Sequence, residues 1–300
     1  MHLAAFDELY QEADARREPV PIAVAGGADR TVLEALRTAC DRDWVTPLVA
    51  GTESAIRRAA GECGVSLHGF TILDAADPSA AAVAEVRRGR ARLLMKGQVA
   101  TPDLMRAVLD PASGLRTGRV ICQVVLMSVR PAGRRFLLAD TGICIQPSLE
   151  QKADILRSCA EVARALGADT PRVAVMAATE TVNGSMPETL DAAELQRRGK
   201  AGDFGDCVVS GPLSFDLAYA VEAASKKRIV DPVAGAADIM LFPNLLSANL
   251  TVKAIMYTAD CRFGGVLCGA ACPVLFMSRA DTTATRLDSM ALGLKLVVGS

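Results

Sequence analysis

Short apolar runs alternate with amphipathic helical patterns along almost the whole chain, and this alternation limits the folds open to it. The apolar runs lie at 21–25, 47–50, 70–73, 92–95, 122–127, 136–139, 173–177, 207–209, 239–242, 265–268 and 274–277. Helical spacing of apolar residues is found at 31–40, 54–63, 79–88, 102–109, 149–166, 187–196, 215–225, 248–259 and 282–292. Apolar strands that alternate with helices predict a mostly parallel sheet with helices on both faces.

Two breaks in this rhythm indicate a division into two α/β domains. The runs at 122–127 and 136–139 follow each other without a helix between them, and a second strand pair precedes the last helix. We therefore predict a discontinuous first domain of 1–135 plus 273–300, and a second domain of 136–272. The length of 300 residues is enough for two hydrophobic cores.

Composition and charge exclude several classes of partner. Hydrophobic residues make up 51% and charged residues 22% of the chain, and the formal net charge is −1. No basic tail or stripe favours nucleic acid or an anionic membrane surface. The first 17 residues form an amphipathic helical pattern, unlike a signal peptide, and the longest apolar stretch, 264–277, is too short to span a bilayer.

Cysteine and histidine usage favours a reducing compartment and no metal centre. The nine cysteines are scattered without regular spacing, which fits a cytoplasmic protein better than a disulfide framework. The only histidines are His2 and His68, so a histidine-rich metal site is excluded and a Ser-His-Asp triad is disfavoured. Neither G-x-G-x-x-G nor G-x-x-x-x-G-K-[ST] occurs, which removes the best signals for a Rossmann dehydrogenase or a P-loop kinase.

Four polar loops follow strands or begin helices, which is where open α/β sheets bind ligands. They lie at 95–106, 139–154, 243–249 and 277–286. The segments LLMKGQVATPDLMRAVLD, LLADTGICIQPSLEQKADIL, SGPLSFD, LFPNLLSANLTVKAI and PVLFMSRADTTATRLDS resemble the phosphate acetyl/butyryltransferase family, in particular its butyryl-type branch. The resemblance runs in order from about residue 20 to the end.

The resemblance implies a two-domain, three-layer α/β/α fold like that of isocitrate and isopropylmalate dehydrogenases, with the active site in the cleft between the domains. It implies an enzyme that moves an acetyl, propionyl or butyryl group between coenzyme A and inorganic phosphate. Coenzyme A is then a substrate, and no permanently bound cofactor or metal is expected. Relatives are usually homo-oligomers, and the same is expected here.

An anionic substrate of this kind needs cationic and hydroxyl groups. Ser278 and Arg279 match the family's Ser-Arg pair at the substrate phosphate, although a serine cap beside a solvated arginine would have the same local sequence. Arg106 matches a second family arginine at the phosphate or acyl phosphate, and a surface charge on an amphipathic helix is the alternative. Lys96, directly after a strand, is a candidate third cation.

The carbonyl oxygen that gains charge in the reaction needs a donor. Asn249 matches a helix position that faces the cleft in the family, as does Lys253; an amide bonded to backbone is the alternative for Asn249. Asp140 and Thr141 lie at the presumed domain junction, where a turn or hinge role competes with catalysis.

The sequence departs from the family pattern at the expected general base. Thr285 stands where acetyl-type members have an aspartate. The nearest carboxylate is Asp281 and the next on the same helix is Asp288, so either Asp281 substitutes as the base or the base lies elsewhere. Ser210 and Asn244 also stand where many relatives have aspartate. These changes support one alternative, a ligand-sensing or scaffolding homologue without turnover. A metal-dependent hydroxyacid dehydrogenase is the other.

The mechanistic rival to direct thiolate attack in a ternary complex is a covalent route through Cys144. This is the only cysteine in a candidate site loop, and it has no histidine nearby to activate it. The residues leave acyl chain length and reaction direction open.

Overall fold

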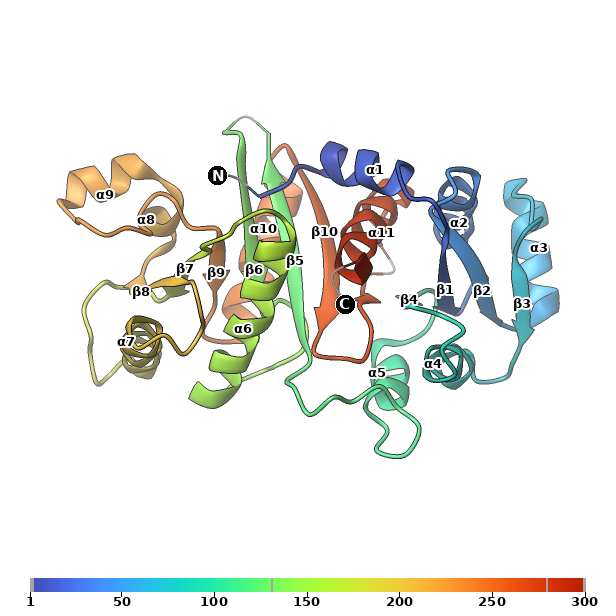
Figure 1. Cartoon of the computed structure of the whole chain (residues 1–300), viewed down its shortest axis with the longest axis horizontal. Helices are drawn as coiled ribbons and strands as arrows, with labels where there is room; N and C mark the ends of the chain where they lie inside the picture. Colours follow the sequence, from blue (N-terminus) through green and yellow to red (C-terminus); the bar gives the residue numbers. More distant parts are fainter. Residues whose placement is uncertain (1–2, 131, 279, 299–300) are drawn as a thin grey trace. The chain divides into compact units, whose positions relative to one another are not determined.

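Each predicted apolar run lies in a strand of the structure, a computed structural model that describes residues 3–130, 132–278 and 280–298. The chain divides into two compact units (Figure 1). Unit 1 comprises Val120–Phe263 and the N-terminal residues up to Ala5, and unit 2 comprises Phe6–Arg119 and the part from Gly264 onward.

Unit 2 is built on a mainly parallel arrangement of strands in the order β3-β2-β1-β4-β11-β10. The strands are β1 (Val20–Ala25), β2 (Val45–Gly51), β3 (Thr71–Asp74), β4 (Leu93–Lys96), β10 (Cys261–Cys268) and β11 (Val274–Leu275). Only the β10–β11 pair among these is antiparallel. Strands β1 and β4 are buried almost throughout, as expected where helices cover both faces.

The helices of unit 2 form two groups. They are α1 (Phe6–Asp14), α2 (Arg30–Asp41), α3 (Glu53–Cys63), α4 (Pro78–Arg87), α5 (Thr101–Leu109) and α11 (Thr283–Val298). Helix α11 packs against α1 and α2, while α4 packs against α5. Figure 1 shows these groups on opposite sides of the strands.

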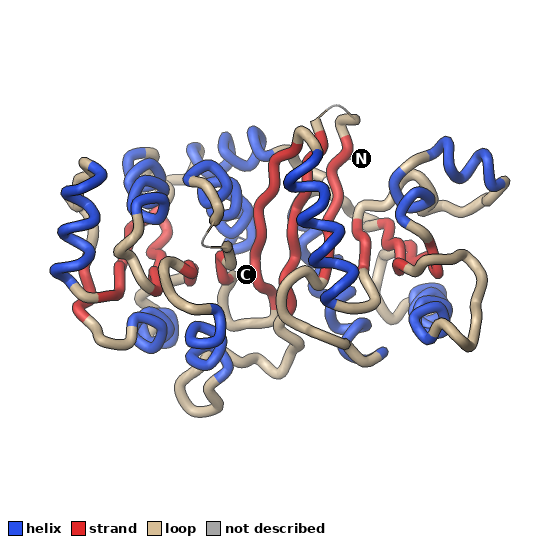
Figure 2. The backbone as a smooth tube through the Cα atoms, turned by 180° about the vertical axis from the view of Figure 1, so that it is seen from behind, coloured by secondary structure: helices blue, strands red, loops and turns tan. Residues whose placement is uncertain are grey.

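Unit 1 has the strand order β5-β6-β9-β7-β8. The strands are β5 (Cys122–Val129), β6 (Arg134–Ala139), β7 (Arg172–Met176), β8 (Val208–Leu213) and β9 (Ile239–Leu241). The helices are α6 (Leu149–Ala165), α7 (Pro187–Lys200), α8 (Phe215–Tyr219), α9 (Val221–Lys227) and α10 (Leu245–Thr258). Strands β5 and β6 are antiparallel, and the other pairs are parallel. Figure 2 shows the strands in red and the helices in blue from behind.

Side chains on alternate positions of these strands build the core of unit 1. Val125, Met127, Phe136 and Leu138 pack together with residues of α8, α9 and α10. The longest helix of the unit, α6, begins with a capping box in which Ser148 and Gln151 satisfy each other's backbone N–H groups.

The units divide at 119/120 and 263/264, whereas the sequence prediction placed the divisions at 135/136 and 272/273. Both predicted divisions cut through an antiparallel strand pair. The first observed division lies before β5, so the β5–β6 pair stays in one unit. The second lies inside β10, before the residues Val266 and Leu267 that pair with β11. Within unit 2, residues 115–117 run beside 269–271, with Ala271 N–H donating to the carbonyl of Leu115.

The prediction of one continuous helix at 215–225 is wrong, because the structure has two helices, α8 and α9, in this segment. The backbone at Ala220 is extended, with φ −118° and ψ 123°, and it separates α8 from α9. Phe215 and Tyr219 stack on each other, and Tyr219 meets Phe136 edge to face. This tertiary packing, rather than a proline or glycine, ends α8. None of the helices in the described part of the chain is long and apolar enough to cross a membrane.

Candidate active site

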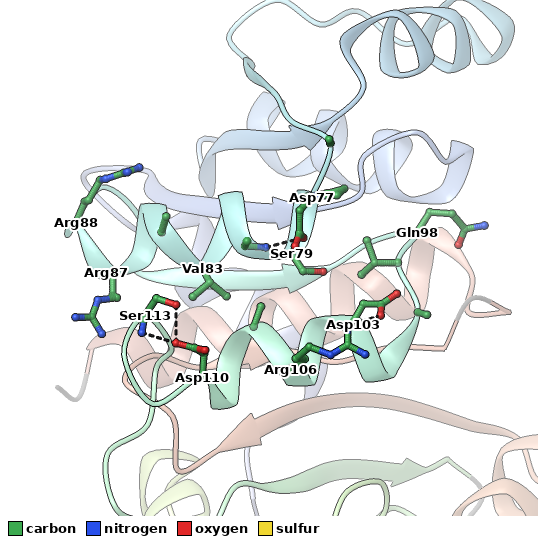
Figure 3. A pocket seen from close by; sticks show the side chains of 17 residues that line it. Asp77, Ser79, Val83, Arg87, Arg88, Gln98, Asp103, Arg106, Asp110 and Ser113 are labelled. Atoms are coloured by element: carbon green, nitrogen blue, oxygen red, sulfur yellow. Dashed lines mark hydrogen bonds and ion pairs between the residues drawn. The ribbon is translucent and has the colours of Figure 1, made fainter.

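Unit 2 contains a cavity of about 930 Å³ beside α4 and α5. Its lining includes the start of α4, the loop after β4 and three arginines, Arg87, Arg88 and Arg106 (Figure 3). Three aspartates, Asp77, Asp103 and Asp110, line it as well. The cavity is therefore lined by cationic and hydrogen-bonding side chains, which are the groups that bind an anionic ligand.

Arg106 lies on α5 and lines this cavity, as Figure 3 shows. Its Nη1 is 3.0 Å from a carboxylate oxygen of Asp103, one turn earlier, and its side chain is 76% exposed. Such an exposed pair is weak, because both ions remain hydrated. An incoming phosphate group can therefore replace Asp103 as the partner of Arg106.

Arg87 and Arg88 at the end of α4 were not among the residues predicted from the sequence. Arg88 pairs with Glu85 at 3.0 Å. Arg87 donates to the carbonyl of Gly114 at 3.3 Å; it forms no direct ion pair within the described part of the chain, and its charge acts on the Asp110 carboxylate. Their signal in the sequence is faint, because two arginines ending a surface helix also complement the helix dipole.

The loop after β4 is held tightly against the loop after β1. Gly97 N–H donates to Ala25 O and Gln98 N–H donates to Gly26 O, at 2.9 and 2.7 Å. A Cβ on Gly97 would lie 2.0 Å from the carbonyl oxygen of Gly26, so this position admits only glycine. Gln98 is thereby placed on the cavity wall, while Lys96 is 2% exposed at the end of β4.

Ser278 and Asp281 lie on one turn between β11 and α11. Ser278 N–H donates to a carboxylate oxygen of Asp281 at 2.8 Å, and Asp281 N–H donates back to Ser278 O at 3.2 Å. Ala280 N–H donates to the Ser278 hydroxyl oxygen at 3.3 Å. Ser278 is exposed. Arg279, predicted as its partner at the phosphate, lies outside the described residues.

The residues near the expected general base have other contacts. Thr285 shares a hydrogen bond with Thr282 at 3.1 Å. Asp288 is 4% exposed and accepts from the Tyr10 hydroxyl at 2.8 Å. Among the carboxylates that the sequence offered for this role, Asp281 is thus the one on the exposed turn.

Asp140 in unit 1 organises a loop from a buried position. Its carboxylate accepts four backbone N–H groups, from Gln123, Gly142, Ile143 and Cys144, at 2.8 to 3.1 Å. The residue is 3% exposed. The structure therefore gives Asp140 the turn role, and it lies inside unit 1 rather than at a division between units.

Asn249 and Thr141 meet in the same unit. The Asn249 side-chain amide donates to the Thr141 backbone carbonyl at 3.0 Å, which is the backbone-bonded alternative considered for this residue. The Thr141 hydroxyl is buried and without a hydrogen-bond partner among the residues described. One amide hydrogen of Asn249 remains beyond the bond to Thr141. Lys253, also on α10, is exposed.

Two departures from the family pattern have ordinary structural positions. The Asn244 side chain accepts from Ser247 N–H at 3.0 Å and caps α10, a role that aspartate performs equally well. Ser210 is buried on β8.

The candidate residues thus form three groups. Arg106 stands with Gln98 in the cavity, Ser278 and Asp281 share a turn, and Thr141 and Asn249 meet beside Asp140. No cluster of three His, Cys, Asp or Glu side chains suited to a metal ion exists among the described residues.

Comparison with known proteins gives matches along nearly the whole chain. The family profile described as "Phosphate acetyl/butaryl transferase" matches residues 74–293. The phosphate butyryltransferase of Clostridium acetobutylicum is 36% identical, with 99% of each chain covered. The phosphate acetyltransferase of Thermotoga maritima is 38% identical over 93% of this chain and 95% of its own.

A solved structure of a phosphotransacylase has the same fold as this chain. The branched-chain phosphotransacylase from Enterococcus faecalis V583 superposes with a TM-score of 0.82 at 27% identity, covering 93% of this chain and 99% of that one. The predicted α/β fold class is confirmed. These matches define the class of protein as acyltransferases that act between acyl-CoA and phosphate. The chain belongs to the phosphate acetyl/butyryltransferase family.

Proposed function

We propose that this chain transfers a short acyl group between coenzyme A and inorganic phosphate, by direct attack with both substrates bound. The observation that carries the proposal is the exposed Ser278 turn at the start of α11, in a chain of this family. Helix N-termini bind anions through free N–H groups, and α11 has 16 residues.

In one direction a phosphate oxygen attacks the thioester carbonyl carbon, the C–S bond breaks, and the thiolate of coenzyme A takes up a proton. In the other direction the thiolate attacks the carbonyl carbon of the acyl phosphate, the C–O bond breaks, and phosphate leaves with the electron pair of that bond. Both directions develop negative charge on the carbonyl oxygen. Holding the two reactants together removes much of the entropic barrier.

The phosphate is assigned to unit 2 residues. Ser278 and Arg279 supply a hydroxyl and a planar guanidinium at the turn, and Lys96 adds charge at the end of β4. Arg106 binds a phosphate group of either substrate, because both carry one, and Arg87 lines the same cavity.

The carbonyl and the thiol proton are assigned to the remaining candidates. The Asn249 amide hydrogen not used by Thr141 is the proposed donor to the carbonyl oxygen. Asp281 is the proposed base that accepts the proton of coenzyme A. Lys253 is proposed to assist binding as an exposed cation on α10.

The direct test is thioester formation from coenzyme A with acetyl phosphate or butyryl phosphate. We expect turnover with at least one of them and intersecting initial-rate plots when both substrates are varied. Binding of coenzyme A without turnover in either direction would contradict the proposal and leave the non-catalytic alternative.

The phosphate assignment is tested by Arg279→Ala. Loss of a charge-assisted contact of about 1.5–3 kcal/mol lowers kcat/KM for acyl phosphate by about ten- to hundredfold. Arg279→Lys recovers part of this, since a point charge lacks the bidentate fork. The KM for coenzyme A changes much less. Near-normal turnover of Arg279→Ala, with an unchanged circular dichroism spectrum, would leave Arg279 as a solvated surface residue.

A further inference from the structure

An arginine on α11 is buried directly behind the Ser278 turn. Arg286 is 1% exposed and ranks among the largest fully buried side chains of the chain. Its Nε donates to the Thr31 hydroxyl oxygen at 2.9 Å, and its Nη2 lies 3.5 Å from the Ser278 carbonyl oxygen. Its Nη1 is buried with no hydrogen-bond partner in the described chain.

This burial is unusual because the cation forms no direct ion pair among the described residues. A buried guanidinium costs several kcal/mol unless a counter-charge and full hydrogen bonding offset it. Arg286 forms no ion pair with any carboxylate of the described residues, and only Asp29 and Asp281 act on it from a distance. Burial accordingly lowers the pKa of Arg286. A leucine or methionine would fill the same space at lower cost if packing were the only role.

The contacts of Arg286 connect the turn to a second segment at the same sheet edge. Thr31 donates its hydroxyl proton to Asp29 at 2.7 Å and so accepts from Arg286 with its lone pair. Asp29 caps α2 by accepting from Val32 N–H. One turn before Arg286 on α11, Thr283 donates to Glu34 of α2 at 2.7 Å. The Ser278 turn is therefore fixed to α2 through α11.

We propose that Arg286 is a positioning residue for the phosphate site: it holds the Ser278 carbonyl in place and supplies a buried positive charge that favours an anion on the turn. This inference rests on the proposed function for its reaction. A phosphate on the turn adds a negative charge to those of Asp29 and Asp281, neither of which forms a direct ion pair with Arg286. A charge in a low-dielectric site acts more strongly than one in water. Arg286 does not touch the substrate, so it acts through the turn and through its field.

The test compares three variants with the parent chain. Arg286→Met keeps the volume and removes the charge, and Arg286→Lys keeps the charge and loses the fork. Arg16→Met is the matched control. Like Arg286, Arg16 has one guanidinium nitrogen 3.5 Å from a backbone carbonyl, in this case Nη1 from that of Leu294 on α11, and one buried nitrogen without a hydrogen-bond partner, in this case Nε. Inorganic phosphate is titrated into each protein by calorimetry, and thermal melting reports stability.

We expect Arg286→Met to melt no lower than the parent and to bind phosphate about tenfold or more weakly. The KM for acyl phosphate rises to match, while the KM for coenzyme A changes less than about threefold. Arg286→Lys keeps phosphate affinity within about threefold of the parent, and Arg16→Met leaves it unchanged.

Parent-like phosphate binding by a folded Arg286→Met would overturn the inference. If Arg286→Met does not fold, Arg286→Lys decides: a tenfold loss of phosphate affinity there would exclude the charge as the active feature. The binding measurement needs no turnover. A parent chain that catalyses no acyl transfer but binds phosphate in a way that depends on Arg286 would therefore contradict the proposed function without contradicting this inference.

Discussion

Arg106 and Arg57 make similar local contacts, each with one carboxylate on its own helix, but they differ in whether they line the cavity. Arg106 pairs with Asp103 at 3.0 Å and Arg57 with Glu53 at 2.6 Å, and both side chains are mostly exposed. Only Arg106 lines the cavity. We expect Arg106→Ala to raise the KM of one phosphate-bearing substrate about tenfold, in the range of a charge-assisted contact, with little loss of stability.

The control is Arg57→Ala, which should change neither kinetics nor melting temperature by a measurable amount. Varying coenzyme A and phosphate separately identifies which substrate Arg106 binds. Equal kinetic effects of the two substitutions would remove Arg106 from the site.

Cys144 gives a prediction about mechanism through its ionisation. Burial, and then the neighbouring Asp140 carboxylate, raises the pKa of the Cys144 thiol to about 12. Because a raised pKa favours the neutral thiol below that value, about one Cys144 in ten thousand is a thiolate at pH 8. We therefore expect Cys144→Ala to keep most of the activity, and alkylation of Cys144, mapped by mass spectrometry, to show no inflection between pH 7 and 10. A dead Cys144→Ala variant that is still folded, together with parallel-line kinetics in the parent, would favour the covalent route.

Residue roles were harder to predict than residue positions. Asp140 stood out as a polar residue after a strand, but only the folded backbone shows that its carboxylate is used by four N–H groups. Arg286 left one signal that a closer look at spacing detects. It shares the i, i+4, i+8 face of α11 with Met290 and Leu294, both buried, so an arginine stands where the pattern requires an apolar residue.

At the scale of elements, the loop after β4 depends on one glycine. Gly97→Ala would place a Cβ 2.0 Å from the Gly26 carbonyl oxygen, a backbone atom that cannot rotate away. We expect a loss of more than about 2 kcal/mol in the free energy of unfolding, as for overpacked cores, together with reduced activity because Gln98 shifts. The matched control is Gly61→Ala on α3, where a Cβ meets nothing within 4 Å and alanine should be neutral or stabilising. Urea unfolding of both variants measures the difference in their free energies of unfolding. Equal values would show that the loop after β4 can move away from the loop after β1 at little cost.

The loop after β6 makes a similar prediction for unit 1. Asp140→Ala leaves four backbone N–H groups without their acceptor, and each buried unsatisfied group costs about 1–3 kcal/mol. We expect at least about 3 kcal/mol of destabilisation in urea, after partial rescue by water. Asp260→Ala, which removes an exposed partner of Arg130 at 3.1 Å, should cost less than about 1 kcal/mol. A small effect of Asp140→Ala would mean that the loop is held by other contacts.

Elements themselves followed closely from periodicity. The buried parallel strands are apolar throughout, and the helices that cover them have one apolar stripe, so both periods are visible in the sequence. The break at Ala220 was missed because it arises from aromatic packing between Phe136, Phe215 and Tyr219, which are distant in sequence or carry no local turn signal.

For the whole molecule, the chain order explains why the division into units was predicted imprecisely. The positions of strands are a local property, but which strands share a unit depends on pairing over long distances. The β5–β6 pair and the paired residues of β10 and β11 each stay within one unit, with divisions at 119/120 and 263/264. The candidate residues are consequently shared out, with Lys96, Arg106, Ser278 and Asp281 in unit 2 and Asp140, Thr141, Asn249 and Lys253 in unit 1.

The antiparallel contact of residues 115–117 with 269–271 has a consequence for how such genes are recombined. The Thr117 hydroxyl donates to the Gly269 carbonyl at 2.6 Å, so the two parts of unit 2 that precede and follow the segment 120–263 are joined by hydrogen bonds. The segment 120–263 is in this sense an insertion between two parts of one unit. Its coding sequence can be exchanged as one block between a butyryl-type and an acetyl-type relative. Such chimaeras would assign the preference for acyl chain length to one unit or the other.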